Sequence, residues 1–588
     1  IMNQSNLKKL QNLLKEKDID IFVINRSDEY LNEYISPNAE RLNFITNFSG
    51  SAGRAIITPT DAFLYVDGRY TFQANTQINA KEIQAKHLNS FWTDLEKILL
   101  EEEYKIALDP TLHSIIEIEK VEKMLENSTS QLQLIDKNFV DLIWENQPKT
   151  QYTDIFDHPT SFAGQGRREK LDILKKFLDQ NEIDHYFVSG LDNIAWLLNL
   201  RADDIKYTPL LYSYLLISKN NKHSLYIKES AMSEVLKKEI KTLININSIE
   251  NIGSIFNTIN LSDTIGLDFN STTYFFLDLL RKKNINSKNL VNPCILLKAI
   301  KNKTEIDGAK KANIRDGVSI TKYIYWLKIK MDINNNTEIS AGEYLKYLRI
   351  RNKFFHSLSF DTISAIGKNA ALPHYRVTKE SNTNFAINKI YLVDSGAQYY
   401  DGTTDITRTV VLGKATKEQK EMFTRVLKGH IALSRHTFKR GTKGTDIDFL
   451  ARRSLNEINC DYDHGTGHGI GSFLSVHEAP QRIAKKTMFD SVELMPGMIL
   501  SNEPGYYKLN EYGIRIENLI LTKEDKNNNL YFENISWCPI DTDLIDKELL
   551  NQEEIIWLNN YHSKVYSNLR YDFKGEELKW LKMVTKPI

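Results

Sequence analysis

Four acidic residues and one histidine lie inside apolar or glycine-rich segments in the last third of this chain. The set consists of Asp394, Asp405, His468, Glu503 and Glu517. An isolated carboxylate in an apolar setting carries a prohibitive desolvation cost. Four carboxylates buried together therefore require bound cations, and two divalent ions would neutralise them. Because paired metals about 3.5–4 Å apart serve many hydrolytic enzymes, this set predicts a dinuclear metallohydrolase.

The spacing of the four acids predicts two β-hairpins. Asp394 and Asp405 are 11 residues apart, Glu503 and Glu517 are 14 apart, and each pair encloses a turn signal. Mirror positions on adjacent antiparallel strands lie side by side, so both pairs can face one cavity if the sheet curves. His468 adds a nitrogen ligand. Oxygen ligands favour Mg, Mn or Ca, and the single imidazole shifts the preference towards Mn, Fe, Co or Zn.

Three further histidines accompany this set: His374, His464 and His477. A hydrolase needs groups that hold a carbonyl oxygen and move a proton, and imidazole suits both tasks near neutral pH. His464 lies four residues before His468, so on one strand the two rings would face the same side. These histidines are therefore candidates for substrate contact.

The first half of the chain contains an internal repeat. Residues 7–70 and 168–230 each begin with a charged amphipathic helix, continue with a short apolar strand after Ile-Asp, and end in further strands. This order predicts two copies of one α/β domain. Proline and glycine signals indicate a linker at 140–166, and a second boundary falls near Asn292-Pro293.

The rest of the chain alternates helices with short strands. Thr304 to Asp307 resembles a capping box that opens a long helix, striped by apolar residues over 320–327. Thr416 and Thr445 are predicted to open two more helices. Residues 551–570 are helix-like with one apolar side, which could pack on its own domain or on a partner subunit.

Composition excludes several classes of function. The chain has 76 basic and 76 acidic residues, so a formal net charge of zero gives no electrostatic reason to expect nucleic acid or an anionic membrane as partner. No apolar run approaches the roughly 18 residues of a membrane span. The three cysteines form no CxxC pair, which fits a reducing, cytoplasmic compartment.

Other catalytic motifs are incomplete. His477-Glu478 begins an HExxH pattern, but Gln481 stands where the second histidine would be, so a zincin site is excluded. The chain contains no GxGxxG, no GxxxxGK[ST] and no GxSxG motif. The five-ligand set therefore carries the functional prediction.

Long segments of the chain resemble aminopeptidase P, the X-Pro aminopeptidases, in their long three-domain cytosolic form. The resemblance lies in VDSGAQYYDGTTDITRT, HGTGHGIGSFLSVHEAP, SNEPGYY, YGIRIENL and LSFDTISAIG, and it extends to LDNIAWLLNLR in the N-terminal half. It implies an α/β (α+β) fold with creatinase-like domains at 1–150 and 151–302. It also implies a pita-bread metallopeptidase domain with a C-terminal extension at 303–588, and a homodimer formed through that domain.

The resemblance implies two divalent metal ions per chain, usually Mn²⁺, with Zn²⁺ or Co²⁺ as alternatives. By this resemblance Asp405 and Glu517 should bridge both ions, Asp394 should bind one of them, and His468 and Glu503 should complete the other. A metal-bridging hydroxide would attack the scissile carbonyl, and Glu503 would orient it and take its proton.

The remaining site residues are assigned by the same resemblance. His374 and His477 match residues that contact substrate and stabilise the tetrahedral intermediate. His464 matches a residue near the proline of the substrate. Arg515 and Tyr507 match positions that hold the first aspartate of the metal set.

The implied reaction removes the N-terminal residue from peptides with proline at the second position. The X-Pro bond lacks an N–H and its ring is rigid, so such a site needs an apolar ring pocket. One alternative is a prolidase, which cuts X-Pro dipeptides with the same ligands. The other is a non-catalytic pita-bread binding protein, although such proteins lose the metal ligands that this chain keeps.

Overall fold

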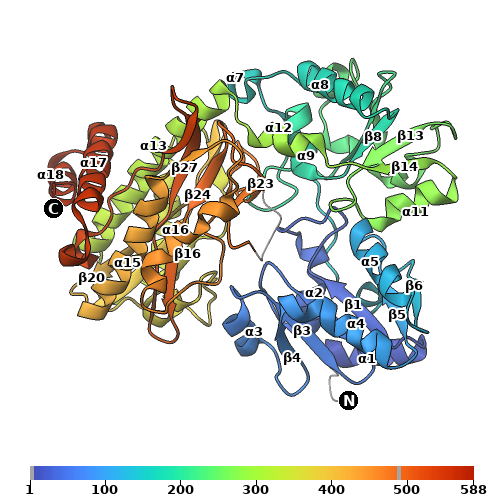
Figure 1. Cartoon of the computed structure of the whole chain (residues 1–588), viewed down its shortest axis with the longest axis horizontal. Helices are drawn as coiled ribbons and strands as arrows, with labels where there is room; N and C mark the ends of the chain where they lie inside the picture. Colours follow the sequence, from blue (N-terminus) through green and yellow to red (C-terminus); the bar gives the residue numbers. More distant parts are fainter. Residues whose placement is uncertain (1–4, 487–491) are drawn as a thin grey trace. The chain divides into compact units, whose positions relative to one another are not determined.

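The structure is a computed structural model that describes residues 5–486 and 492–588 (Figure 1). The chain divides into two compact units. The N-terminal unit comprises the chain up to Asp157 with Gln165–Lys206 and Leu210–Cys294. The C-terminal unit comprises His158–Gly164, Tyr207–Pro209 and Ile295–Ile588.

Two six-stranded sheets with one topology build the N-terminal unit. Their strand orders are β4-β3-β2-β1-β5-β6 and β12-β11-β10-β8-β13-β14. The central strands β1 and β8 each have an antiparallel neighbour, β2 or β10, and a parallel neighbour, β5 or β13. The predicted repeat is therefore confirmed down to strand direction. The first sheet consists of β1 (Ile21–Asn25), β2 (Arg54–Ile57), β3 (Ala62–Val66), β4 (Gln84–His87), β5 (Lys105–Leu108) and β6 (Gln131–Leu134). The second consists of β8 (His185–Val188), β10 (Tyr214–Ser218), β11 (Ser224–Ile227), β12 (Asn245–Ser248), β13 (Thr264–Leu267) and β14 (Asn286–Asn289).

Each repeat opens with an amphipathic helix beside a fully buried strand. The first helix, α1 (Asn6–Glu16), begins after Ser5, whose side chain caps it. Its counterpart is α8 (Arg167–Gln180). Every residue of β1 and β8 is buried. Both helices bury leucines at helical spacing, which are Leu7, Leu10 and Leu14 in α1 and Leu171, Leu174 and Leu178 in α8.

The C-terminal unit contains four sheets that carry the candidate site. Their orders are β15-β18-β19, β16-β17-β20, β21-β28-β27-β24-β22-β23, and the hairpin β25-β26. The strands of the first two are β15 (Phe355–Leu358), β16 (Ile363–Ile366), β17 (Lys389–Ser395), β18 (Ala397–Tyr399), β19 (Gly402–Thr403) and β20 (Ile406–Leu412). The others are β21 (Thr437–Lys439), β22 (Gly467–Gly469), β23 (Glu478–Ile483), β24 (Ile499–Asn502), β25 (Gly505–Lys508), β26 (Tyr512–Arg515), β27 (Asn518–Glu524) and β28 (Asn529–Asn534).

Six helices pack around these sheets. They are α13 (Lys303–Tyr325), α14 (Glu338–Ile350), α15 (Lys417–Ser434), α16 (Gly444–Asn456), α17 (Gln552–Leu569) and α18 (Gly575–Val584). Helix α13 packs on α14, and α15 packs on α16. One large apolar core joins α13, α15, α17 and α18 to β17 and β20, so the sheet that bears the aspartates is anchored from several sides.

The helix starts partly differ from expectation. Thr416 and Gln419 form the predicted capping box of α15. The long helix α13 begins earlier than predicted, because Asn302 rather than Thr304 accepts from the backbone of Glu305. Asparagine caps a helix as well as threonine does, and Asn302 lies two residues before Thr304. Helix α16 likewise follows Lys443, before the predicted start at Thr445.

The C-terminal helix α17 packs on its own unit. It contacts α13 and α15 and buries the side chains of Leu558, Tyr561, His562, Val565 and Leu569. Of the two possibilities left open by the sequence, its own domain is therefore the observed partner of the apolar side.

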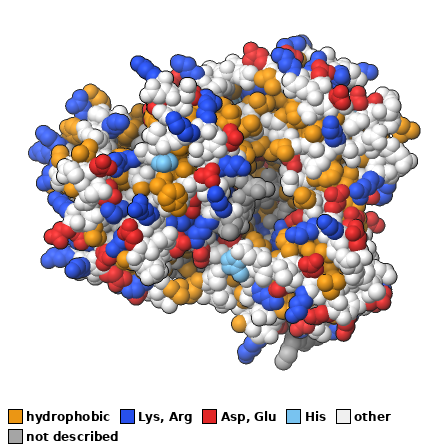
Figure 2. Space-filling model, viewed as in Figure 1, with side chains coloured by type: hydrophobic (Ala, Val, Ile, Leu, Met, Phe, Trp, Pro, Cys, Tyr) orange, Lys and Arg blue, Asp and Glu red, His pale blue; other side chains and the backbone are white. Residues whose placement is uncertain are grey.

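Charge is mixed over the visible surface. Figure 2 shows basic and acidic side chains interspersed on one face of the molecule, in keeping with the formal net charge of +0. Within residues 5–486 and 492–588, none of the helices has both the length and the hydropathy that crossing a bilayer requires. The three cysteines Cys294, Cys460 and Cys538 are free thiols.

Candidate metal centre

The two aspartates lie where a hairpin passes from one sheet to another. Strands β17 and β20 pair antiparallel, with Asp394 opposite Thr407 and Ser395 opposite Ile406. Beyond this pair the chain joins a different sheet through β18 and β19. Asp405 lies two residues before Thr407, on the same side of the ribbon, and so reaches the space in front of Asp394. The predicted pairing of these strands is observed.

The two glutamates occupy the same kind of position in a second hairpin. Strands β24 and β27 pair antiparallel, and their last pair is Asn502 with Asn518. Glu503 follows directly and Glu517 precedes directly, and the separate hairpin β25–β26 lies between them. Both acid pairs therefore sit at a break between sheets.

His468 enters from β22, where glycine on both sides allows close strand packing. A Cβ on Gly467 would lie 2.0 Å from the carbonyl oxygen of Ser501 on β24. A Cβ on Gly469 would lie 2.3 Å from the carbonyl oxygen of Glu478 on β23. The glycine-rich sequence thus lets the backbone carry the imidazole between two neighbouring strands.

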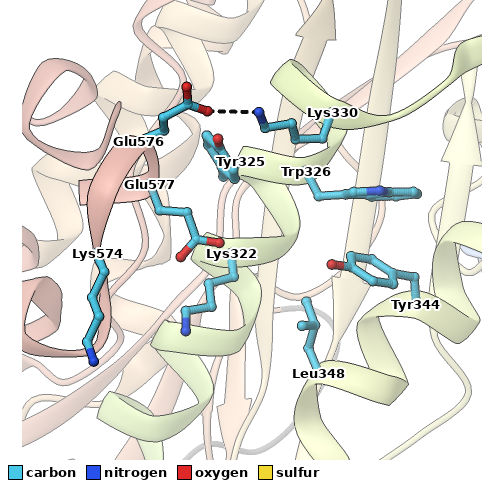
Figure 3. Close-up of a pocket in the computed structure, with 9 residues that line it drawn as sticks. All are labelled: Lys322, Tyr325, Trp326, Lys330, Tyr344, Leu348, Lys574, Glu576 and Glu577. Atoms are coloured by element: carbon cyan, nitrogen blue, oxygen red, sulfur yellow. Dashed lines mark hydrogen bonds and ion pairs between the residues drawn. The ribbon is translucent and has the colours of Figure 1, made fainter. Parts of the chain in front are cut away.

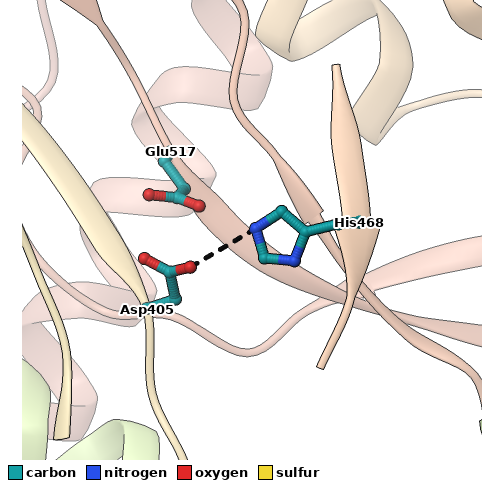
Figure 4. A group of neighbouring side chains, drawn as sticks. All are labelled: Asp405, His468 and Glu517. Atoms are coloured by element: carbon teal, nitrogen blue, oxygen red, sulfur yellow. Dashed lines mark ion pairs between the residues drawn. The ribbon is translucent and has the colours of Figure 1, made fainter. Parts of the chain in front are cut away.

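The imidazole of His468 lies next to the carboxylates of Asp405 and Glu517 (Figure 4). Asp405, His468 and Glu517 each offer a ligand atom within 4.8 Å of the others. Nε2 of His468 lies 3.5 Å from Oδ2 of Asp405 and 3.3 Å from Oε1 of Glu503. Nδ1 lies 2.9 Å from the carbonyl oxygen of Gly469, so Nδ1 carries the proton. Nε2 is then the ring nitrogen that could bind a metal.

Three acids of the cluster resist ionisation. Burial raises the pKa of Asp405 and of Glu517 well above the usual range, and the neighbouring carboxylates raise both further. Burial raises the pKa of Glu503 to about 7, against the opposing charge of Arg515. Two oxygens, Oδ1 of Asp394 and Oδ1 of Asp405, are buried without a hydrogen-bond partner in the described part of the chain. Such orphaned acceptors call for an explanation, and the donor set fits divalent cations.

A chain of hydrogen bonds leads away from Asp394. Nη2 of Arg515 donates to Oδ2 of Asp394 at 2.7 Å, and Nη1 donates to the hydroxyl of Tyr507 at 2.7 Å. That hydroxyl lies 2.7 Å from Nε2 of His464. Nδ1 of His464 lies 2.8 Å from the carbonyl oxygen of Gly465 and donates to it. Tyr507 therefore donates to Nε2 of His464, so the donor and the acceptor of each hydrogen bond in this series are assigned.

The other two histidines occupy different surroundings. The ring of His477 lies edge-on to that of His468, with centroids 4.3 Å apart, so His477 borders the cluster. His374 lies in the turn after the 3-10 helix η7 (Gly367–Ala371), which packs on β26, the strand of Arg515. The prediction that His464 and His468 face the same side of one strand is wrong, because β22 begins only at Gly467.

Sequence reasoning missed the threonines that hold these ligands. The hydroxyl of Thr407 donates to Oε2 of Glu517 at 2.7 Å. Thr409 exchanges two hydrogen bonds with the backbone of Arg515. Asp405, Thr407 and Thr409 alternate with period two in TDITRT, which is the signal that would have placed them on one face.

A cavity of about 390 Å³ lies elsewhere in the same unit (Figure 3). It is lined by residues of α13, α14 and α18 and of the segments next to them, which include Tyr325, Trp326, Tyr344 and Lys574. None of the ten predicted site residues lines it, so it is separate from the carboxylate cluster.

Sequence models of known families match most of the chain. The sequence model of metallopeptidase family M24 matches residues 307–524, and that of the C-terminal region of peptidase M24 matches 528–588. Two models of the creatinase/prolidase N-terminal domain match residues 6–137 and 146–305. These matches agree with the predicted fold of two creatinase-like domains followed by a pita-bread domain.

Two similar proteins match this chain over almost the full length of both partners. A "Probable Xaa-Pro aminopeptidase P" of Paracoccidioides brasiliensis is 36% identical, over 99% of this chain and 98% of its own length. The crystal structure of X-prolyl aminopeptidase from Caenorhabditis elegans, described as a cytosolic enzyme with a di-nuclear active site, superposes with a TM-score of 0.94 at 32% identity and covers 99% of both chains. A prolidase from Pyrococcus horikoshii covers only 63% of this chain and 99% of its own, with 25% identity and a TM-score of 0.51.

Proposed function

The chain belongs to the aminopeptidase P family of the M24 metallopeptidases, and from this membership we propose how its site residues divide the work. The protein is an Xaa-Pro aminopeptidase, a metal-dependent hydrolase that removes the N-terminal residue from peptides with proline second. The observation that carries this function is the buried cluster of Asp405, His468 and Glu517. A prolidase is not favoured, because the similarity to aminopeptidases extends over the whole chain.

Five residues would hold two divalent ions. They are Asp394, Asp405, His468, Glu503 and Glu517. A set of four carboxylates and one imidazole favours Mn²⁺, with Zn²⁺ and Co²⁺ as the alternatives. When bound, the ions polarise the scissile carbonyl and lower the pKa of water.

Glu503 is proposed as the residue that accepts the proton of the attacking water. Its Oε1 lies 3.3 Å from Nε2 of His468, so the carboxylate is within reach of the cluster that would hold the water, as a general base must be. Ser501 donates to Oε1 of Glu503 at 3.1 Å and so fixes the direction of the carboxylate.

The histidines and the chain to Asp394 are proposed to orient the reacting groups. His477 borders the cluster and would donate to the oxygen that becomes negative in the tetrahedral intermediate. His374 would contact the substrate from the turn after η7. Tyr507 and Arg515 hold Asp394 from behind, and His464, fixed by Tyr507, would line the proline side.

Domain limits, assembly and location are further parts of the proposal. The limits 1–150, 151–302 and 303–588 are supported by the order of the family matches. A cytoplasmic location is supported by three free thiols and by the description of the nematode relative as cytosolic. A homodimer is proposed from the family resemblance, and light scattering during gel filtration tests it.

The function is tested on chelator-stripped protein with Mn²⁺ titrated back. Three substrates are compared, an X-Pro-Z tripeptide, an X-Pro dipeptide and an X-Ala-Z tripeptide. We expect Mn²⁺-dependent cleavage of the X-Pro-Z peptide alone. Glu503→Gln should lower kcat by about 10²–10⁴-fold, the usual contribution of a general base. Glu524→Gln, at the end of β27, is the matched control and should behave like the wild type.

The other outcomes are equally informative. Cleavage of the dipeptide alone would make the protein a prolidase. No cleavage of any peptide, together with no retained metal, would contradict the enzymatic function and favour a binding role.

A further inference from the structure

A buried arginine lies directly behind the metal ligand Glu517. Arg408 is 1% exposed, and in the described part of the chain it forms no ion pair with a carboxylate. All its hydrogen-bond partners in that part are neutral oxygens. Nη1 donates to the carbonyl oxygens of Thr407 and Glu517, both at 2.8 Å. The guanidinium thus ties β20, the strand after Asp405, to the backbone of Glu517.

The other side of Arg408 faces the C-terminal segment. Nη2 donates to the carbonyl oxygen of Cys538 at 2.8 Å and to the hydroxyl of Tyr561 at 2.7 Å. Nε donates to the carbonyl oxygen of Pro539 at 3.1 Å. A buried cation must have its donors hydrogen-bonded. Half of the acceptors that Arg408 contacts belong to residues after β28.

Tyr561 is a rigid partner for this arginine. Its ring on α17 stacks with Trp557, at a centroid distance of 5.4 Å, and with Trp537, at 6.1 Å. Its hydroxyl accepts from Arg408 and lies 2.7 Å from the carbonyl oxygen of Cys538, to which it donates. The hydroxyl can therefore neither rotate away nor exchange partners at little cost.

A second contact fixes the same segment to α17 and to the aspartate sheet. The backbone N–H of Ile540 donates to Nε2 of His562 at 3.0 Å. One residue further on, Oδ2 of Asp541 accepts from the backbone N–H of Val411 on β20 at 3.0 Å. Helix α17 therefore holds residues 538–541 against the sheet that carries the aspartates.

We propose that Tyr561, acting through Arg408, is a positioning residue for Glu517, so that the C-terminal helix contributes to the affinity of the metal centre. The inference rests on the proposed role of Glu517 as a metal ligand. Without cations no ion holds the buried acids of the cluster in place, so the position of Glu517 must come from the protein. Thr407 holds its carboxylate, while Arg408 holds its backbone.

The test compares two tyrosine variants of α17 in the full-length protein. Tyr561→Phe removes only the hydroxyl that Arg408 contacts, and the stacked ring remains. Tyr566→Phe, on the same helix and half-buried, is the matched control. Mn²⁺ binding to chelator-stripped protein is measured by calorimetry, well below the melting temperature of each variant. Metal content after dialysis and kcat at saturating Mn²⁺ are measured alongside.

We expect Tyr561→Phe to bind Mn²⁺ about tenfold more weakly, at the low end of effects seen for residues behind metal ligands. Because the ligands themselves are intact, kcat should return when Mn²⁺ is in excess. Tyr566→Phe should bind as the wild type does. A second variant, Arg408→Lys, should weaken binding further, since lysine replaces the five fixed donors of the guanidinium with three on a mobile ammonium.

Two outcomes separate this inference from the proposed function. If wild-type protein binds Mn²⁺ and Tyr561→Phe binds it within twofold as tightly, the positioning role is overturned while the enzyme assignment stands. If wild-type protein binds no divalent ion, the proposed function itself fails, and the positioning role fails with it.

Discussion

Two sites in the C-terminal unit bury carboxylates in opposite ways. Glu338, at the start of α14, is fully buried and accepts hydrogen bonds from several donors of one segment. Their donor atoms belong to Ile366, Asn369, Tyr375 and Thr383, at 2.8–3.2 Å. The metal cluster buries Asp405 and Glu517 as deeply, yet leaves Oδ1 of Asp405 without a donor.

The difference shows what each site is built to hold. Burial raises the pKa of Glu338, while its donors lower it. At the cluster the neighbouring acids add to the effect of burial and raise the pKa of Asp405 and Glu517 well above normal. The carboxylate of Glu338 is satisfied by hydrogen-bond donors of the protein. The metal cluster lacks such donors, and its carboxylates are satisfied only when cations bind.

The largest expected effect comes from removing one charge of the cluster. Asp405→Asn should lower kcat/KM at least about 10³-fold, because a ligand and its charge are lost. The same change should raise the melting temperature of the metal-free protein, because it relieves repulsion between buried carboxylates. Asp136→Asn, on the surface of the N-terminal unit, controls for the chemical change. A lower melting temperature of the metal-free Asp405→Asn protein would contradict this account.

The second prediction concerns pH. The folded pKa of Glu503, about 7, lies above the value near 4.3 of an unfolded chain. The folded state therefore holds this proton more tightly. The resulting stability is fully present below the unfolded pKa and is lost as pH rises through about 7. From Glu503 alone we expect the metal-free protein to lose on the order of 3 kcal/mol between pH 5 and pH 9, measured by denaturant unfolding.

The matched control for this profile is the Mn²⁺-loaded protein. Burial lowers the pKa of His430 to about 3 and of His562 to about 4, so both contribute stability that falls as pH drops below about 6.5. These contributions are present with and without metal. They cancel in the difference between the two profiles, and a difference that stays flat through pH 7 would refute the prediction.

The smallest expected effect comes from the site of Glu338. Glu338→Gln replaces one acceptor oxygen by an amide that would face existing donors. We expect it to lower the free energy of unfolding by about 1–3 kcal/mol, with unchanged Mn²⁺ affinity. Denaturant unfolding of the metal-free and Mn²⁺-loaded forms measures both. If Glu338→Gln stabilised the protein as Asp405→Asn is expected to, the contrast between the two sites would disappear.

Much of the fold could be predicted because local patterns and tertiary structure agree. The repeated helix–strand order of the N-terminal half became two sheets of one topology, and Thr416 with Gln419 capped α15 as expected. Where two nearby residues could cap a helix, as Asn302 and Thr304 could, the sequence did not show which one does.

The site was predictable to the level of strand pairing and no further. Spacing predicted the pairing of β17, which carries Asp394, with β20, but Asp405 lies just before β20 rather than in it. Spacing could not show that His464 lies outside β22 and turns to Tyr507. Nor could it reveal Arg408, whose partners lie more than 100 residues away along the chain in Glu517, Cys538 and Tyr561.

The breaks between sheets have a consequence for how such a site can change. Each acid pair stands at the base of its hairpin, where one ladder of backbone hydrogen bonds stops and another begins. A loop lengthened beyond that point, for example at the tip between β25 and β26, would not shift the register of β24 and β27. The positions of the metal ligands can therefore stay constant while the loops around the site change. One metal centre can thus acquire different peptide preferences by changes at its hairpin tips alone.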